Sequence, residues 1–281
     1  MLEVGRFNSL KVVKKVSFGA YLDGMDWGEI LLPRHVVPEG TVMGDRLDVF
    51  IYFDSDDKII ATTKRPYITL GNCAFLKVID VNRVGAFLDW GLDKDLLVPK
   101  AEQRRPMQQD KSYLVYLTQD NQQRLVASSK LDHHLDQTRS HLHVGDEVDV
   151  LIAETTDLGT KVIVNHAYWG LIYAGDIFQS LQYGQRTRGY IKTVRDDGKL
   201  DIVLRKLGQN NISGLAQRIL DALIQAGGFL PLHDKSSPDE IKYAFNESKK
   251  NFKHAIGHLY RKGKIDLKPD GICLQKKQEA K

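Results

Sequence analysis

The chain lacks the features that hold secreted and membrane proteins together. Its 281 residues include only two cysteines, Cys73 and Cys273, which lie far apart within apolar segments. We therefore expect buried free thiols rather than a disulfide. No segment approaches the roughly 20 apolar residues that a membrane-spanning helix needs, and the N-terminal residues 1–6 do not have the layout of a signal peptide. These absences predict a cytoplasmic protein without membrane contact.

Motifs that carry chemistry are also scarce. The one dense acidic run, Asp54–Asp57, falls in a predicted hairpin turn, where Asp and Ser are common, rather than among the gathered carboxylates of a metal-dependent nuclease. His254 and His258 have i, i+4 spacing without the adjacent glutamate of a zinc protease, and there is no glycine-rich phosphate loop or activated nucleophile. Four histidines at positions 133, 134, 141 and 143 lack zinc-ligand spacing. We expect a non-enzymatic protein with no cofactor and no metal.

Basic charge is concentrated at the C-terminus. The formal net charge is only +4, but residues from Ile212 onward contain 13 basic and 8 acidic side chains, against 27 and 28 in the preceding residues. A basic segment on a near-neutral body favours a polyanionic partner, although a modest excess of this kind also occurs on ordinary surfaces.

What the chain does contain is a repeat. Phe18-Gly-Ala-Tyr-Leu-Asp23 followed by Gly28–Pro33 matches Val84-Gly-Ala-Phe-Leu-Asp89 followed by Leu96–Pro99, with a spacing of 66 residues. Each copy is followed by the same two later strands. A third, diverged copy begins at Gly145 and carries Leu158 and Lys161 where the first copy has its two aromatic residues. A period of this length is typical of a small self-contained domain rather than a solenoid repeat.

Each copy predicts five short strands, which in the first copy lie at about 4–15, 18–23, 28–32, 46–53 and 58–64. Such units suggest Greek-key barrels of the oligonucleotide/oligosaccharide-binding (OB) type, which bind ligand across strands two and three. We therefore predict a mainly β multidomain chain with three OB-fold barrels at 1–64, 65–136 and 137–209. A connecting helix is expected at 130–143.

The C-terminal segment, 210–281, has helical patterns in place of the repeated strands. Helical spacing over Ile212–Gln225, a capping box at Ser237–Glu240 and a further helix over Ser248–Arg261 precede a small hairpin at 264–274. We expect Phe252, Ile256, Leu259 and Tyr260 to face inward on the third helix. Three helices and a two-strand wing predict an α+β winged helix-turn-helix domain, whose third helix usually contacts nucleic acid. Many such domains instead bind proteins.

The expected site follows from the OB-fold topology. Phe18 and Tyr21 would share the ligand face if a bulge at Gly19 brought them together; otherwise one of them belongs to the core. Phe87 and Trp90 are the corresponding aromatics of the second copy. Exposed aromatics would stack bases, and nearby basic groups would contact phosphates. We predict stacking by Phe18, Tyr21 and Phe87, and phosphate contacts by Arg34, Lys100, Arg104, Arg105, Arg124, Lys249, Lys250, Lys253 and Arg261.

These motifs resemble a known family. The Gly-Ala-aromatic strands, each followed by Leu-Leu-Pro or Leu-Val-Pro, are similar to the S1 RNA-binding domain. The tandem followed by Ser248–Tyr260 resembles the conserved virulence factor B family of bacterial RNA-binding proteins. The resemblance implies single-stranded RNA as the partner and an influence on gene expression connected with virulence. The first copy keeps both S1 aromatics, whereas Val84 replaces one in the second copy.

Two other functions remain open from the sequence. The winged helix would serve an adapter by docking on a protein machine such as the ribosome or a polymerase, or it would serve a regulator that binds duplex DNA. Substituting Lys249, Lys250 and Lys253 together separates the first alternative from RNA binding, because phosphate contacts make affinity depend on salt.

Overall fold

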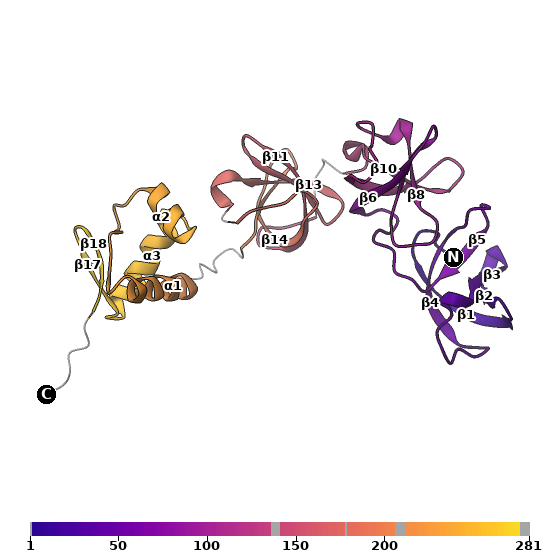
Figure 1. Ribbon diagram of the computed structural model, residues 1–281, viewed down its shortest axis with the longest axis horizontal. Coiled ribbons are helices and arrows are strands. Elements are labelled where there is room, and N and C mark those ends of the chain that lie inside the picture. The colour runs from indigo at the N-terminus through magenta and orange to yellow at the C-terminus, as the bar shows by residue number, and fades with distance from the viewer. Residues whose placement is uncertain (1, 136–140, 178, 206–211, 276–281) are drawn as a thin grey trace. The chain divides into compact units, whose positions relative to one another are not determined.

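The computed structural model describes residues 2–135, 141–177, 179–205 and 212–275 (Figure 1). It divides into two compact units. One comprises residues 1–137, 163–169 and 183–186, and the other comprises the remaining residues. The predicted fold class is confirmed: three five-stranded β domains precede a domain of three helices and a small sheet.

The first barrel is a closed sheet of the order β1-β2-β3-β5-β4. The parallel pairing of Leu31 on β3 with Ile60 on β5 closes it. This is the five-stranded Greek-key arrangement expected of an OB fold. Its elements are β1 (Phe7–Val16), β2 (Gly19–Asp23), β3 (Glu29–Pro33), β4 (Arg46–Phe53) and β5 (Ile59–Thr62), with 3₁₀ turns at Met25–Trp27 and Arg34–Val36.

The second and third domains repeat this plan. The second contains β6 (Cys73–Val81), β7 (Gly85–Leu88), β8 (Leu96–Pro99), β9 (Ser112–Gln119) and β10 (Leu125–Ser128). Its order is β10-β9-β6-β7-β8, and β8 and β10 lie side by side although no strand pairing joins them. The third contains β11 (Glu147–Thr156), β12 (Gly159–Val164), β13 (Tyr168–Tyr173), β14 (Arg186–Val194) and β15 (Leu200–Val203), and it is closed again.

A shared close approach explains the glycine that begins the second strand of every copy. A Cβ atom on Gly19 would lie 2.2 Å from the carbonyl oxygen of Leu32, and one on Gly85 would lie 2.2 Å from that of Val98. In the third barrel a Cβ on Gly159 would lie 2.1 Å from the carbonyl oxygen of Ile172. Only glycine lets the backbones come this close. The glycine therefore recurs in each copy because the backbones of two neighbouring strands approach too closely for a side chain at this position.

The bulge expected at Gly19 lies on the neighbouring strand instead. The register of β1 against β2 shifts between Val12 and Lys14, and that of β6 against β7 shifts between Val78 and Asp80. A bulge on the longer first strand adds a residue there and leaves β2 regular.

The first two barrels share an aromatic junction. Trp90, expected as a binding aromatic, is only 2% exposed. Its ring centroid lies 5.8 Å from that of Phe50 and 6.1 Å from that of Tyr52, both on β4 of the first barrel. The indole N–H donates to the carbonyl of Lys94 at 2.5 Å. The assignment of Trp90 to the ligand face was wrong, because the second barrel uses this side chain to bury surface against the first.

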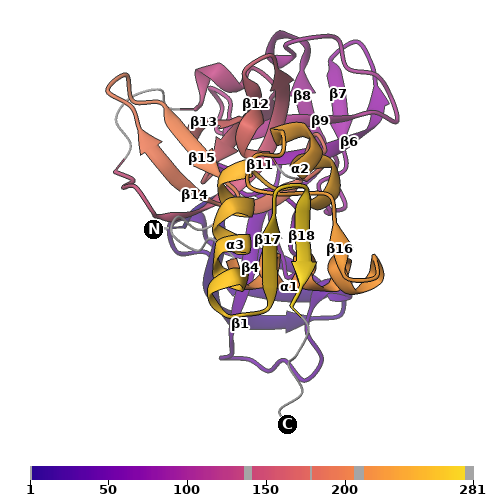
Figure 2. The same ribbon diagram turned by 90° about the vertical axis from the view of Figure 1, so that its left-hand side faces the viewer.

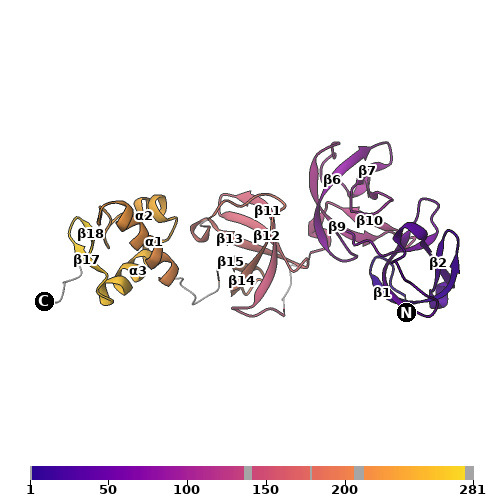
Figure 3. The same ribbon diagram turned by 60° about the horizontal axis from the view of Figure 1, so that its bottom comes forward.

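The C-terminal domain is a winged helix (Figures 2 and 3). It contains α1 (Ile212–Gln225), β16 (Phe229–Leu230), α2 (Pro238–Phe245), α3 (Lys249–Arg261), β17 (Ile265–Lys268) and β18 (Gly271–Leu274). The predicted capping box is formed, since Ser237 Oγ accepts from the N–H of Glu240 while the Glu240 carboxylate accepts from the N–H of Ser237. The sequence reading missed β16, a two-residue strand that pairs with β18.

Two local expectations need revision. Tyr260 was expected inside and is 53% exposed, whereas Phe252, Ile256 and Leu259 are buried as expected. Of the helix expected at 130–143, the described part is a 3₁₀ turn at Leu131–His133, and residues 136–140 lie outside the described residues. No helix in the described parts of the chain is long and apolar enough to cross a membrane.

Candidate nucleic-acid interface

The second strand of the first barrel and the residue before it present two aromatic rings together. Ala20 and Leu22 of β2 are buried, so Tyr21 between them points outward. Phe18 immediately precedes β2 and is 56% exposed. The two rings meet edge to face, with centroids 6.3 Å apart and an interplanar angle of 86°. The alternative in which one ring belongs to the core is therefore excluded.

Cations flank this aromatic pair. The ammonium group of Lys14 lies 5.8 Å from the centroid of Tyr21, within cation–π range. Arg34 follows β3, where its N–H donates to the carbonyl of Phe18 at 2.9 Å and its guanidinium lies 3.5 Å from the carbonyl oxygen of Ser17. The sequence reading missed Lys14, because only the bulge in β1 places this residue opposite Tyr21. We name the group Lys14, Phe18, Tyr21 and Arg34 the barrel-one face.

The second barrel keeps part of this arrangement. Phe87 points outward from β7 at the position of Tyr21, and Lys100 stands where Arg34 does, with its N–H donating to the carbonyl of Val84 at 3.2 Å. Asp80 pairs with Phe87 across the strands, where the first barrel has Lys14 paired with Tyr21. The charge beside the outward aromatic is thus reversed.

The other predicted cations of the second barrel differ in their availability. Arg104 and Arg105 are exposed in the segment after β8. Arg124 is held by its own hairpin, with Nη2 2.7 Å and Nε 2.8 Å from Oδ2 of Asp120. A phosphate would have to compete with this carboxylate for Arg124.

The third barrel has moved its aromatic residue to the next strand. Lys161 of β12 replaces Tyr21, but Tyr173 at the end of β13 stands where the first two barrels have proline. Lys192 and Arg195 lie 5.9 and 5.8 Å from the centroid of Tyr173, and Arg195 also hydrogen-bonds its hydroxyl group. Both cations are already paired, with Asp176 and Asp201 respectively.

In the winged helix, α3 carries most of the predicted basic residues. Lys250, Lys253 and Arg261 are exposed, whereas Lys249 is half-buried and donates to the carbonyl of Lys235 at 3.2 Å. Residues 250, 253, 257, 260 and 261 recur at helical spacing, so the exposed Tyr260 joins this stripe. The sequence reading had placed that aromatic in the core.

Two further observations concern chemistry. The Cys73 thiol is buried, and burial raises its pKa to about 12, so it stays protonated at neutral pH and is a poor nucleophile. Among the described residues, no group of three or more His, Cys, Asp or Glu side chains is placed to hold a metal ion.

Family models match the barrels and the last domain. An S1 domain model matches residues 4–64 and 70–130, and a CvfB-like winged helix domain model matches residues 217–274. Two S1 domains, a third barrel and a winged helix define a multidomain chain of nucleic-acid-binding type.

Full-length relatives specify the family. The chain is 31% identical to the uncharacterized protein YitL of Bacillus subtilis (strain 168), over 97% of this chain and 94% of that protein. It is 30% identical to conserved virulence factor B of Staphylococcus epidermidis (strain RP62A), over 84% and 82%. It is 29% identical to the Staphylococcus aureus (strain USA300) protein of that name, over 84% and 81%. The chain belongs to the conserved virulence factor B family.

Proposed function

We propose that the protein binds single-stranded RNA without catalysing a reaction, and that the barrel-one face is its principal stacking site. One observation carries this proposal: the exposed Phe18 and the partly exposed Tyr21 meet on a single face, with centroids 6.3 Å apart and with Lys14 and Arg34 beside them. Aromatic rings beside cations suit single strands, because unpaired bases can stack while phosphates meet the cations.

The winged helix supplies a second, electrostatic contact in this proposal. Lys250, Lys253 and Arg261 form an exposed stripe on α3 with Tyr260 among them. Such a stripe attracts the phosphate backbone without reading its sequence. Phe87, Lys100, Arg104 and Arg105 extend the path across the second barrel. Arg124 contributes less, because Asp120 already holds its guanidinium.

RNA is proposed over DNA on the basis of the two S1 domains, since stacking surfaces alone do not distinguish the two polymers. The names of the staphylococcal relatives connect those proteins with virulence, and binding RNA would let this protein influence gene expression in that context. An adapter that docks on a protein through the winged helix, or a regulator that binds duplex DNA, would use the same C-terminal domain differently.

The test is binding of the full chain to a single-stranded RNA and a duplex DNA of equal length, measured by fluorescence anisotropy at two salt concentrations. We expect the RNA to bind more tightly, with an affinity that falls as salt rises. Preference for the duplex would support the DNA-binding regulator. Failure to bind either polymer would refute the proposal and direct attention to protein partners.

A further inference from the structure

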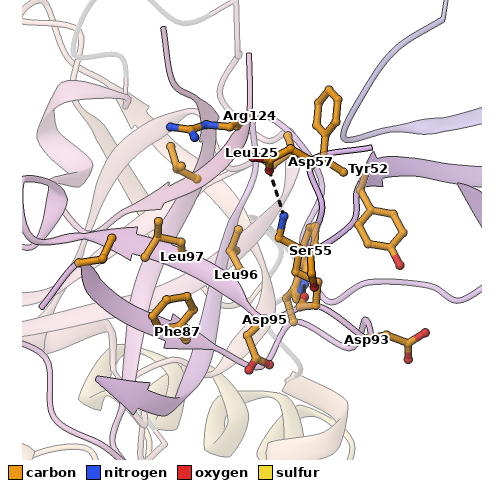
Figure 4. Close-up of a pocket in the computed structure, with 15 residues that line it drawn as sticks. Tyr52, Ser55, Asp57, Phe87, Asp93, Asp95, Leu96, Leu97, Arg124 and Leu125 are labelled. Atoms are coloured by element: carbon orange, nitrogen blue, oxygen red, sulfur yellow. Dashed lines mark hydrogen bonds and ion pairs between the residues drawn. The ribbon is translucent and has the colours of Figure 1, made fainter. Parts of the chain in front are cut away.

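A cavity of about 560 Å³ lies where the second barrel meets the first (Figure 4). Its volume is within the roughly 300–1,000 Å³ typical of small-ligand pockets. The second barrel contributes its outward aromatic, Phe87, to the lining. Figure 4 labels ten of the lining residues: Tyr52, Ser55 and Asp57 from the first barrel, and Phe87, Asp93, Asp95, Leu96, Leu97, Arg124 and Leu125 from the second.

The cavity lies beside the contact between β8 and β10 of the second barrel. In the first barrel Leu31 and Ile60 pair and close the sheet. The corresponding residues of the second barrel, Leu97 on β8 and Val126 on β10, belong to strands that lie in contact without strand pairing, and both residues line the cavity. Apolar side chains beside Phe87 provide the kind of wall against which a flat ring packs.

Most charges at the cavity are already paired. Lys94 lies 3.6 Å from Asp57, Asp93 pairs with Lys64 and with His35, and Arg124 pairs with Asp120. Asp95 is different: within the described parts of the chain it has no hydrogen-bond or ion-pair partner. Partial burial, with Asp89 and Asp80 nearby, raises the pKa of Asp95. An unpaired carboxylate beside other carboxylates repels phosphate and attracts hydrogen-bond donors.

The two barrels therefore differ in the charge that they place beside the aromatic ring that would stack on a bound RNA strand. Beside Tyr21 the first barrel places Lys14, a phosphate-binding group, whereas beside Phe87 the second places Asp80 and, within the cavity, Asp95. Lys100 follows β8 at the position that Arg34 has after β3, and Arg104 and Arg105 come later in the same segment. Phe87 pairs with Leu97 of β8, between the cations that follow this strand and Asp95, which precedes it.

We infer that this cavity holds one unstacked base of the RNA, packed on Phe87, and that Asp95 selects bases with an exocyclic amino group by accepting a hydrogen bond from it. Cytosine and uracil have the same ring size, but cytosine presents an amino donor where uracil presents a carbonyl acceptor. The cavity therefore favours cytosine over uracil. This inference rests on the proposed RNA binding and adds base selectivity at one place.

The test compares short oligo(C) and oligo(U) RNAs of equal length at neutral pH, by fluorescence anisotropy with the full chain. We expect about tenfold tighter binding of oligo(C). Asp95→Asn should bring the ratio of the two affinities close to one, because an amide offers a donor to uracil as well as an acceptor to cytosine. Asp48→Asn is the matched control, since it removes the same charge from an exposed position on β4 and should leave the ratio unchanged. Phe87→Ala should weaken the binding of both RNAs.

The outcomes separate the inference from the proposed function. Tight binding with equal affinity for both RNAs, or a preference for oligo(C) that survives Asp95→Asn, would overturn the base pocket and leave RNA binding intact. If neither RNA bound, both the proposed RNA binding and the base pocket would be refuted. Binding of an oligolysine peptide that competes with RNA and is lost in Asp95→Asn would assign the cavity to a basic protein segment, and this too would overturn the inference.

Discussion

Replacing Phe18 by alanine tests the barrel-one face directly. The ring is 56% exposed and contacts Tyr21 edge to face, outside the buried core of the first barrel. Truncation should therefore have little effect on folding. If one base stacks on Phe18, the loss of binding free energy should be about 1–3 kcal/mol, which corresponds to a Kd raised by roughly 5- to 150-fold.

The assay is RNA binding by anisotropy, with thermal unfolding of each variant to confirm that it is folded. Tyr67→Ala provides a matched control, because Tyr67 is 60% exposed but belongs to the segment between β5 and β6. We expect this control to bind like the wild type. An unchanged Kd for Phe18→Ala, or an equal loss in both variants, would refute the reasoning that this face stacks bases.

Three further predictions concern the second barrel, the winged helix and the ion pairs of Asp93. Val84→Phe restores the missing aromatic of the second barrel and should tighten RNA binding by a similar factor; a weaker complex would contradict the equivalence of the two faces. Replacing Lys250 and Lys253 by glutamine should flatten the dependence of log Kd on log salt by about 1.4, at roughly 0.7 for each phosphate contact on a single strand. An unchanged slope would favour the adapter. Hydrogen bonds from Lys64, then His35, lower the pKa of Asp93, so its ionised form stabilises the fold above the unfolded value of about 3.9 and loses this effect in acid. Asp93→Asn should lower the free energy of unfolding at neutral pH by at most about 1 kcal/mol for such an exposed pair, and denaturant unfolding should show the difference vanishing as pH falls through the folded pKa.

The architecture could be predicted from local patterns. Each of these patterns spans only a few neighbouring residues. They are the strand sequence that occurs in three copies, the capping box at Ser237 and the spacing of apolar residues in α1 and α3. For this reason the fold class and the bounds of the three C-terminal helices were predicted correctly or within a residue. The two-residue strand β16 was missed, because it is defined only by its pairing with β18.

The candidate site was harder to predict from local sequence patterns. Lys14 enters the barrel-one face through a bulge that shifts the register of β1, and no residue type in the sequence marks that shift. Trp90 resembles a ligand-binding aromatic in sequence but is buried against Phe50 and Tyr52. Arg124 and Lys249 look like free cations until Asp120 and the carbonyl of Lys235 are seen to hold them.

The sequence by itself thus determined the number of domains of each class, the glycines on which the barrels depend and the strand that carries the paired aromatic residues. These are set by steric fit and by hydrophobic periodicity between near neighbours. Only the tertiary structure decided which cations remain available, which aromatics are exposed and where a cavity forms beside the second barrel. Those properties depend on pairings between residues far apart in the chain, such as Trp90 with Phe50 and Lys94 with Asp57, which no local pattern encodes.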